Sequence, residues 1–125
     1  MSKTERKVIV AATQFACSAD IEKNIEKAEK LVRDAADKKA NIILLQELFA
    51  APYFCQEQRA EFFALASSAS VRVLHSCSLT LILQPDENPL LRRFARLSAE
   101  LNVVLPISFF ERANNAHYNS VVSAA

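Results

Sequence analysis

The sequence predicts an α/β fold, and three observations support this prediction. Residues 7–14 and residues 41–47 each contain an apolar run that is too short for an ordinary helix. Neither run alternates with polar residues, so each predicts a strand that is covered on both faces. Residues 20–39, between the two runs, carry apolar side chains at helical spacing. A strand, a helix and a strand in this order form a βαβ unit within a mostly parallel sheet.

The helix predicted over residues 20–39 is amphipathic. Its side chains separate onto different faces: the apolar set is Ile21, Ile25, Ala28, Leu31, Val32 and Ala35, and the charged set is Glu22, Lys23, Glu26, Lys27, Lys30 and Asp34. Either Ser18 or Asp20 is available as the N-cap. Charges of both signs along a helix are typical of a solvated face, so we expect no binding patch there.

The rest of the chain predicts two more helices and two more strands. One helical stretch covers residues 56–66, and an amphipathic helix begins at Pro89, a residue suited to a first helical turn. Strands are predicted at residues 103–110 and 118–122. Pro106, within the third strand, predicts a bulge or an edge position. The predicted element order is therefore β-α-β-α-α-β-β.

Composition and charge exclude several classes of function. With 51% hydrophobic and 23% charged residues, the chain is globular in type. A net charge of +1 gives no electrostatic case for binding nucleic acid or an anionic membrane. We recognise no secretory signal and no apolar segment long enough to span a membrane, and therefore expect a cytoplasmic protein. The absence of glycine excludes the usual glycine-rich phosphate loops and suggests that the segment is incomplete.

Glu47 is the first candidate for catalysis. It follows Gln46 at the carboxyl end of the second predicted strand, the edge at which ligands usually bind in open α/β sheets. Leu48 and Phe49 come next, and an apolar environment raises the pKa of a Glu side chain and suits a general base near neutral pH. The structural alternative is a carboxylate that caps a helix or pairs with a nearby Lys or Arg.

The three cysteines, Cys17, Cys55 and Cys77, are widely spaced and form neither a disulfide framework nor a zinc-ligand pattern. Cys77 would form a nucleophilic pair with His75 only if the two side chains touch in space. Cys17 and Cys55 are either reactive thiols or packed ones, and packing is the usual fate of a lone cysteine.

Asn114, Asn115 and His117 follow the third predicted strand. They either hydrogen-bond a ligand or serve the turn itself. We favour the turn, because Asn is common in turns.

Three blocks of sequence together resemble the nitrilase, or carbon–nitrogen hydrolase, superfamily. They are residues 10–17, residues 40–49 with 53–56, and residues 101–120, and the likeness covers residues 7–65 and 88–122. The last block, together with residues 46–49 and 53–56, is similar in detail to one subfamily, the plant-type N-carbamoylputrescine amidases. The resemblance implies that residues 1–125 are the N-terminal portion of one hydrolase domain with an αββα sandwich fold.

The resemblance also implies a Glu-Lys-Cys triad. Glu47 matches the general base, which takes the thiol proton and later activates the water that clears the acyl-enzyme. Tyr53 and Phe54 would shape the pocket for a small carbamoyl amine. The implied reaction converts N-carbamoylputrescine to putrescine, carbon dioxide and ammonia in polyamine synthesis from arginine. No metal, organic cofactor, nucleic acid or membrane is implied, and full-length members of the family are expected to form homo-oligomers.

The sequence departs from the family in two ways. The family's Lys and its nucleophilic Cys lie in blocks beyond position 125, and none of Cys17, Cys55 and Cys77 occupies the nucleophile's motif. Residues 67–86 have no counterpart in the family, which predicts an insert from a misplaced exon boundary or a retained intron. The alternative function is therefore an inactive, truncated fragment that at most associates with full-length subunits.

Overall fold

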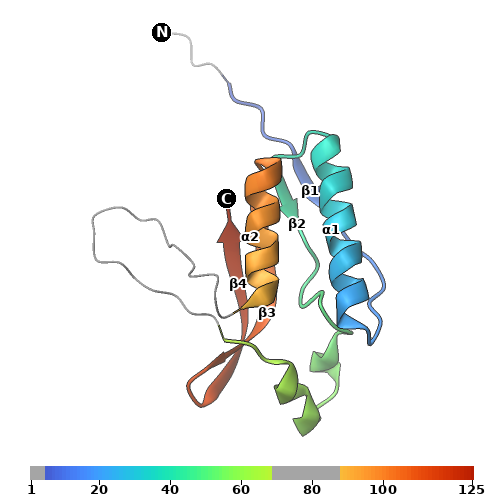
Figure 1. Ribbon diagram of the computed structural model, residues 1–125, viewed down its shortest axis with the longest axis vertical. Coiled ribbons are helices and arrows are strands. Elements are labelled where there is room, and N and C mark those ends of the chain that lie inside the picture. The colour runs from blue at the N-terminus through green and yellow to red at the C-terminus, as the bar shows by residue number, and fades with distance from the viewer. Residues whose placement is uncertain (1–4, 69–87) are drawn as a thin grey trace, which may run out of the picture.

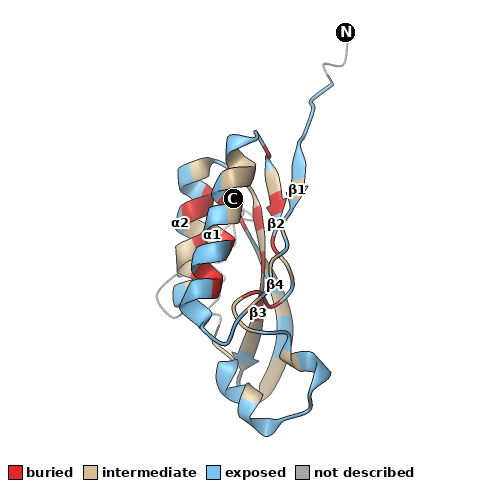
Figure 2. Ribbon diagram, turned by 90° about the vertical axis from the view of Figure 1, so that its right-hand side faces the viewer, coloured by how far each residue is buried: buried red, intermediate tan, exposed pale blue. Residues whose placement is uncertain are grey.

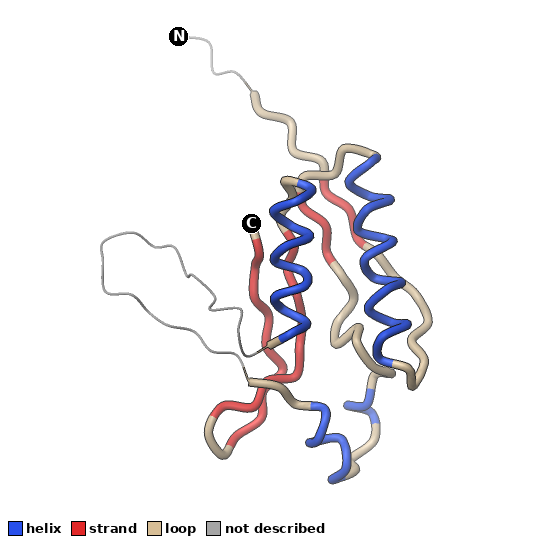
Figure 3. Tube along the Cα trace, viewed as in Figure 1, coloured by secondary structure: helices blue, strands red, loops and turns tan. Residues whose placement is uncertain are grey.

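The computed structural model describes residues 5–68 and 88–125, which form a layer of strands with helices packed against it (Figures 1 and 3). The elements in chain order are β1 (Val10–Ala12), α1 (Ile21–Asp37), β2 (Ile42–Leu44), the 3-10 helices η1 (Phe54–Gln56) and η2 (Ala60–Leu65), α2 (Pro89–Leu101), β3 (Leu105–Ala113) and β4 (Ala116–Ala124). The α/β class predicted from the sequence is confirmed for these residues. None of the helices in the described ranges is long and apolar enough to cross a membrane.

Four strands lie side by side. β1 pairs in parallel with β2, and β3 pairs antiparallel with β4 from Leu105 opposite Ala124 to Ala113 opposite Ala116. One parallel bridge joins the two pairs, because Val104 N–H donates to the Asn41 carbonyl at 2.8 Å and Ile43 N–H donates to the Val104 carbonyl at 2.9 Å. This bridge places the end of the first βαβ unit against the start of β3.

One prediction about local structure was wrong. Residues 56–66 do not form one α-helix, because η1 and η2 are separate short 3-10 helices. Of the two alternatives for Pro106, the bulge is excluded, since Pro106 keeps a regular register opposite Ser123 in β4. The edge position stands, because among the described strands β3 pairs only with β4 at Pro106. Strands predicted at 7–14 and 41–47 are also shorter in the structure, three residues each, because their pairing ends where the neighbouring strand ends.

The core lies between the helices and one face of the sheet (Figure 2). Its fully buried side chains include Ile43 of β2, Phe94 of α2 and Ile107 of β3. The Phe94 ring meets the ring of Phe49 edge to face, with centroids 5.1 Å apart. Edge-to-face contacts of this kind stabilise a core beyond the area that they bury.

The opposite face of the sheet carries no helix (Figure 2). Val10, Leu44 and Val121 on this face are 70%, 50% and 69% exposed. The prediction that the first two strands are covered on both faces is therefore wrong for the described residues. We call this surface, formed by the outward side chains of β1 to β4, the open face.

Ion pairs join the two helices along their length. Arg93 of α2 binds Glu29 of α1 through two bonds of 2.8 Å and also contacts Glu22. These carboxylates hold the pKa of Arg93 above its ordinary value, with Glu29 as the main cause. Arg33 of α1 forms a two-pronged pair with Glu100 at 2.6 and 3.0 Å. The charged side of α1 is thus partly a contact between helices, and not only the solvated face that its sequence predicts.

Residues other than glycine adopt the left-handed backbone conformation at the turns. Lys39 after α1, Asn102 after α2 and Asn114 in the β3–β4 turn have φ angles of 69°, 53° and 55°. After α1, Lys39 N–H donates to the Ala36 carbonyl and Ala40 N–H to the Ala35 carbonyl, the double hydrogen bond with which many helices end. Asparagine tolerates this conformation, but lysine does so at a steric cost.

We predict that Lys39→Gly stabilises the protein by about 0.5–1 kcal/mol, because glycine removes the steric cost of the left-handed conformation. Urea unfolding followed by circular dichroism measures the change. Lys38→Gly is the matched control, since Lys38 has an ordinary φ of −80° and its replacement should destabilise the protein. Equal destabilisation by both variants would contradict the steric cost assigned to the left-handed conformation of Lys39.

Candidate active site

Glu47 lies in a short loop directly after β2, and contacts with other segments hold this loop in place. Upstream of Glu47, the side chain of Gln46 accepts a hydrogen bond from Phe15 N–H at 2.7 Å. Downstream, the carbonyl of Phe49 accepts one from the Cys17 thiol at 3.3 Å, and the Phe49 ring is fully buried. Glu47 is therefore an exposed side chain on a well-anchored backbone.

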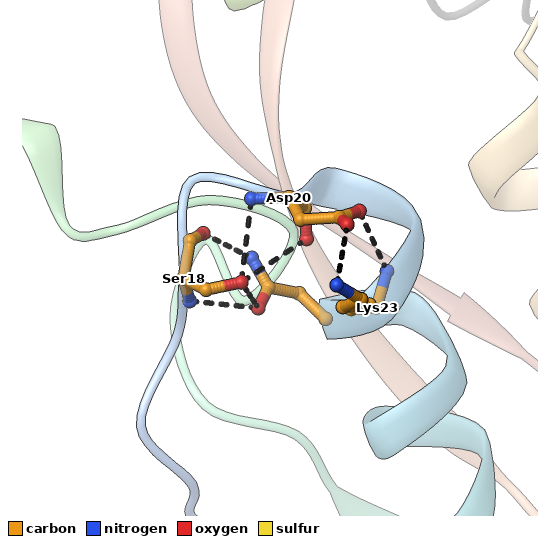
Figure 4. Close-up of polar contacts among 4 residues, drawn as sticks. Ser18, Asp20 and Lys23 are labelled. Carbon is orange, nitrogen blue, oxygen red and sulfur yellow. Dashed lines mark hydrogen bonds and ion pairs between the residues drawn. The ribbon is translucent and has the colours of Figure 1, made fainter.

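Asn24 of α1 holds the end of the same loop. It is fully buried, and its Nδ2 donates to the carbonyls of Ala50 at 3.1 Å and Ser18 at 2.7 Å. The helix start nearby is capped by Asp20, whose carboxylate accepts from Lys23 N–H at 3.1 Å (Figure 4). This bond holds the pKa of Asp20 below its ordinary value. The structure thus assigns the cap to Asp20, while Ser18 lies beside it and accepts a hydrogen bond from Asp20 N–H.

Leu48 has a strained backbone. Its φ angle is 51°, in the left-handed region that is unfavourable for a leucine, and its side chain is 3% exposed. Leu48 N–H donates to Ser108 Oγ of β3 at 3.2 Å, which helps to hold this conformation. Backbone strain of this kind concentrates at functional sites. The observation marks the peptide beside Glu47 as a candidate functional position.

The carboxylate of Glu47 contacts residues from two other segments. Asn119 of β4 donates from Nδ2 to Glu47 Oε1, and the phenol of Tyr53 lies close enough to interact with the carboxylate. The negative charge of Glu47 is the main cause that raises the pKa of Tyr53, and the nearby Cys55 adds to it. The expectation that apolar neighbours surround the carboxylate was wrong. The side chains of Leu48 and Phe49 point into the core, and the side chain of Glu47 is exposed.

Phe54 lies in an aromatic cluster next to Tyr53. Its ring centroid is 5.0 Å from that of Phe110 and 5.5 Å from that of Phe62. Hollows of about 490 Å³ and about 250 Å³ are lined by residues that include Phe54 and Phe110. Glu47 lines neither of these two hollows, and its neighbours include Tyr53 and Asn119.

The two described cysteines differ in environment. Burial raises the pKa of the Cys17 thiol, which also accepts a hydrogen bond from Gln46 Nε2 at 3.1 Å. Cys17 therefore fits the packed alternative. Cys55 is exposed near Tyr53. The suggested pair of His75 and Cys77 lies outside the described residues.

The polar residues after β3 serve the turn and the aromatic cluster. Asn114 and Asn115 form the turn of the β3–β4 hairpin, as favoured from the sequence. His117 packs against Phe63 with ring centroids 4.6 Å apart. Within residues 5–68 and 88–125, no cluster of three or more His, Cys, Asp or Glu side chains is arranged to hold a metal ion.

Sequence reasoning gave no role to Asn24, Ser108 or Asn119. Ser108 and Asn119 are polar positions on strands β3 and β4, and their outward direction follows only once the register is known. The signal that could have found them is a polar residue within an otherwise apolar strand pattern. Together with Glu47 they form a hydrogen-bonded carboxylate site at the open face.

The comparisons with known proteins identify the family. The sequence pattern of the family described as carbon-nitrogen hydrolase matches residues 9–124. The chain belongs to this family. A crystal structure of a carbon-nitrogen hydrolase from Helicobacter pylori G27 superposes with a TM-score of 0.70 at 29% identity, covering 93% of this chain and 35% of that chain. The nitrilase-type fold expected from the sequence is confirmed for this portion.

Curated relatives carry two names. N-carbamoylputrescine amidase of Arabidopsis thaliana is 49% identical over 117 residues, covering 93% of this chain and 33% of that protein. Citrullinase of Francisella tularensis subsp. tularensis (strain SCHU S4 / Schu 4) is 35% identical over 112 residues, covering 90% of this chain and 34% of that protein. The chain thus spans about a third of the length of the curated relatives that it matches.

We predict that Glu47→Gln lowers the pKa of Tyr53, because it removes the negative charge that opposes ionisation of the phenol. A spectrophotometric titration of tyrosinate measures the shift. The chain has two tyrosines, so the comparison is made in a Tyr118→Phe background. An unchanged midpoint would show that the two side chains are not neighbours.

Proposed function

We propose that this chain is the base-bearing, N-terminal part of an N-carbamoylputrescine amidase, with Glu47 as the general base. The observation that carries the proposal is the exposed carboxylate of Glu47 on an anchored loop after β2, beside a strained Leu48 and next to Tyr53. Glu47 would take the proton of a cysteine thiol that attacks the carbamoyl carbon, and would pass it to the leaving nitrogen as the C–N bond breaks. The regenerated carboxylate would then activate the water that releases the acyl group.

The remaining members of the triad match no residue of this sequence. By resemblance, a lysine would stabilise the oxyanion and a cysteine would be the nucleophile. The open face, with its exposed Val10, Leu44 and Val121, is the surface that a second sheet would cover in an αββα sandwich. Glu47 and Asn119 would then lie at the edge of the interior of the completed domain.

The names of the relatives support the proposed substrate class. N-carbamoylputrescine and citrulline both carry a carbamoyl group on the nitrogen of an aliphatic amine. Identity is higher to the N-carbamoylputrescine amidases, at 48–49% against 35% for the citrullinase. Tyr53 and Phe54 would shape the pocket for the aliphatic chain. The products would be putrescine, carbon dioxide and ammonia, in cytoplasmic polyamine synthesis, with neither a metal nor an organic cofactor.

Residues 67–86 would be an insert relative to the family. Of these, residues 69–86 lie outside the described residues, while Ser67 forms a parallel bridge with Glu111 of β3. Sequencing the transcript across codons 66 to 88 tests this proposal. A spliced transcript that joins the two flanks directly would support it, and a continuous coding exon across the region would contradict it.

A second candidate function is that of a non-catalytic chain that associates with full-length subunits. The exposed apolar side chains of the open face favour it, since such surfaces mark protein contacts. The two candidates differ in one measurement. Only the first requires Glu47 to be essential once the triad is complete.

We predict that residues 1–125 alone release no ammonia from N-carbamoylputrescine, because acyl transfer needs the thiol and the lysine as well. A completed chain joins residues 1–125 to the remaining two thirds of the Arabidopsis relative, and this chain should release ammonia. Two versions of the completed chain are made, one with residues 67–86 and one without them. In the active form, Glu47→Gln should lower the rate by about 10²–10⁴-fold, the usual contribution of a general base.

The control is Glu26→Gln, which makes the same substitution at an exposed position on α1 and should keep the rate of the parent. A Glu47→Gln enzyme that works at the parent rate would contradict the role of Glu47 and would leave it as a structural carboxylate.

A further inference from the structure

A closed chain of hydrogen bonds surrounds Glu47. Leu48 N–H donates to Ser108 Oγ at 3.2 Å, and Ser108 Oγ lies 3.4 Å from Asn119 Oδ1, to which it donates. Asn119 Nδ2 in turn donates to Glu47 Oε1. Because Leu48 follows Glu47 in the sequence, the chain of hydrogen bonds begins and ends in the same dipeptide.

The carboxylate of Glu47 determines the direction of these bonds. An ionised carboxylate only accepts hydrogen bonds, so Asn119 presents its NH₂ group to Glu47. The Oδ1 atom of Asn119 accepts from the Ser108 hydroxyl, and the oxygen of that hydroxyl accepts from the Leu48 amide. Ser108, held by the Leu48 amide, thereby supports the orientation of the Asn119 side chain toward Glu47.

The strands make this arrangement rigid. Ser108 pairs opposite Val121, and Asn119 pairs opposite Phe110, within the regular antiparallel register of β3 and β4. Both side chains lie on the open face, while Ile107 and Phe109, on either side of Ser108 in β3, point into the core. A shift of β4 by one residue against β3 would turn Asn119 to the other face, away from Glu47.

We propose that Ser108 and Asn119 are positioning residues for Glu47. The inference rests on the proposed function of Glu47 as the general base. Asn119 holds one carboxylate oxygen in place, so that the side chain keeps one orientation when the thiol proton arrives. As a neutral amide, Asn119 orients the carboxylate without competing for the proton. The strained backbone of Leu48 directs its amide N–H toward Ser108 Oγ, where the chain of hydrogen bonds begins.

The hydrogen bond itself is testable in the 125-residue chain by NMR. Acidification that protonates Glu47 should shift the side-chain amide resonances of Asn119, and Glu47→Gln should abolish this response. Glu111→Gln is the matched control, because the Glu111 carboxylate accepts from Ser120 Oγ at 2.5 Å on the adjacent residue. A pH response that persists in Glu47→Gln, or that is lost in Glu111→Gln, would overturn the proposal.

The effect on catalysis is testable in the completed chain described above. Asn119→Ala should lower kcat by roughly 10–100-fold with little change in KM, since misplacing a reacting group costs rate and not affinity. Ser108→Ala should lower kcat in the same direction. Ser123→Ala is the control, because it removes an exposed polar side chain from the same strand and face. An unchanged kcat in Asn119→Ala, or an equal rise in KM, would overturn the positioning role.

The NMR experiment and the kinetic experiment separate this inference from the proposed function. If Glu47→Gln retained the parent rate, the proposed function would fail whatever the NMR result. If Glu47→Gln lost the rate while Asn119→Ala kept it, only the positioning role would fail.

Discussion

The pairing of β2 with the start of β3 is the contact on which the rest of the structure depends. Two hydrogen bonds, from Val104 to Asn41 and from Ile43 to Val104, join segments about 60 residues apart in the chain. Ile43 is fully buried at this junction, between the sheet and the helices. Because β4 is fixed to β3 by a long antiparallel register, the junction also determines which residue of β4 faces the end of β2. That residue is Asn119, and the residue it meets is Glu47.

The anchored loop after β2 holds Glu47 in a fixed position beside the paired strands. Cys17, Asn24 and Ser108, from three separate segments, each bond the backbone of residues 48–50. The hydrophobic side chains of Leu48 and Phe49 point into the core and leave Glu47 exposed between fixed neighbours. A catalytic carboxylate needs a fixed position, and here the position comes from the backbone and from Asn119, not from burial of the carboxylate itself.

Periodicity predicted the two long helices well, because an apolar face recurs every 3.6 residues regardless of what covers it. It could not show that Arg93 bonds Glu22 and Glu29, since a charged face has the same pattern whether it meets water or another helix.

Glu47 could be selected from its place after a strand and from the family resemblance. Its partner Asn119 is 72 residues away, and only the strand register brings the two together. The short 3-10 helices η1 and η2 were not predicted, because their aromatic residues pack on Phe110 of β3 and His117 of β4, two strands that are distant in the sequence.

The segments on either side of residues 69–87 form one sheet through the bridge between β2 and Val104 at the start of β3. Hydrogen exchange of the Val104 amide measures this pairing, because this N–H has its partner, the Asn41 carbonyl, across the junction. We expect the amides of Val104 and Ile43 to be protected and to open with the same free energy, as parts of one cooperative unit. The Val103 amide bonds to the Ser98 carbonyl at the end of α2 and does not depend on the junction. A protected Val103 amide together with a freely exchanging Val104 amide would contradict the pairing of β2 with the start of β3.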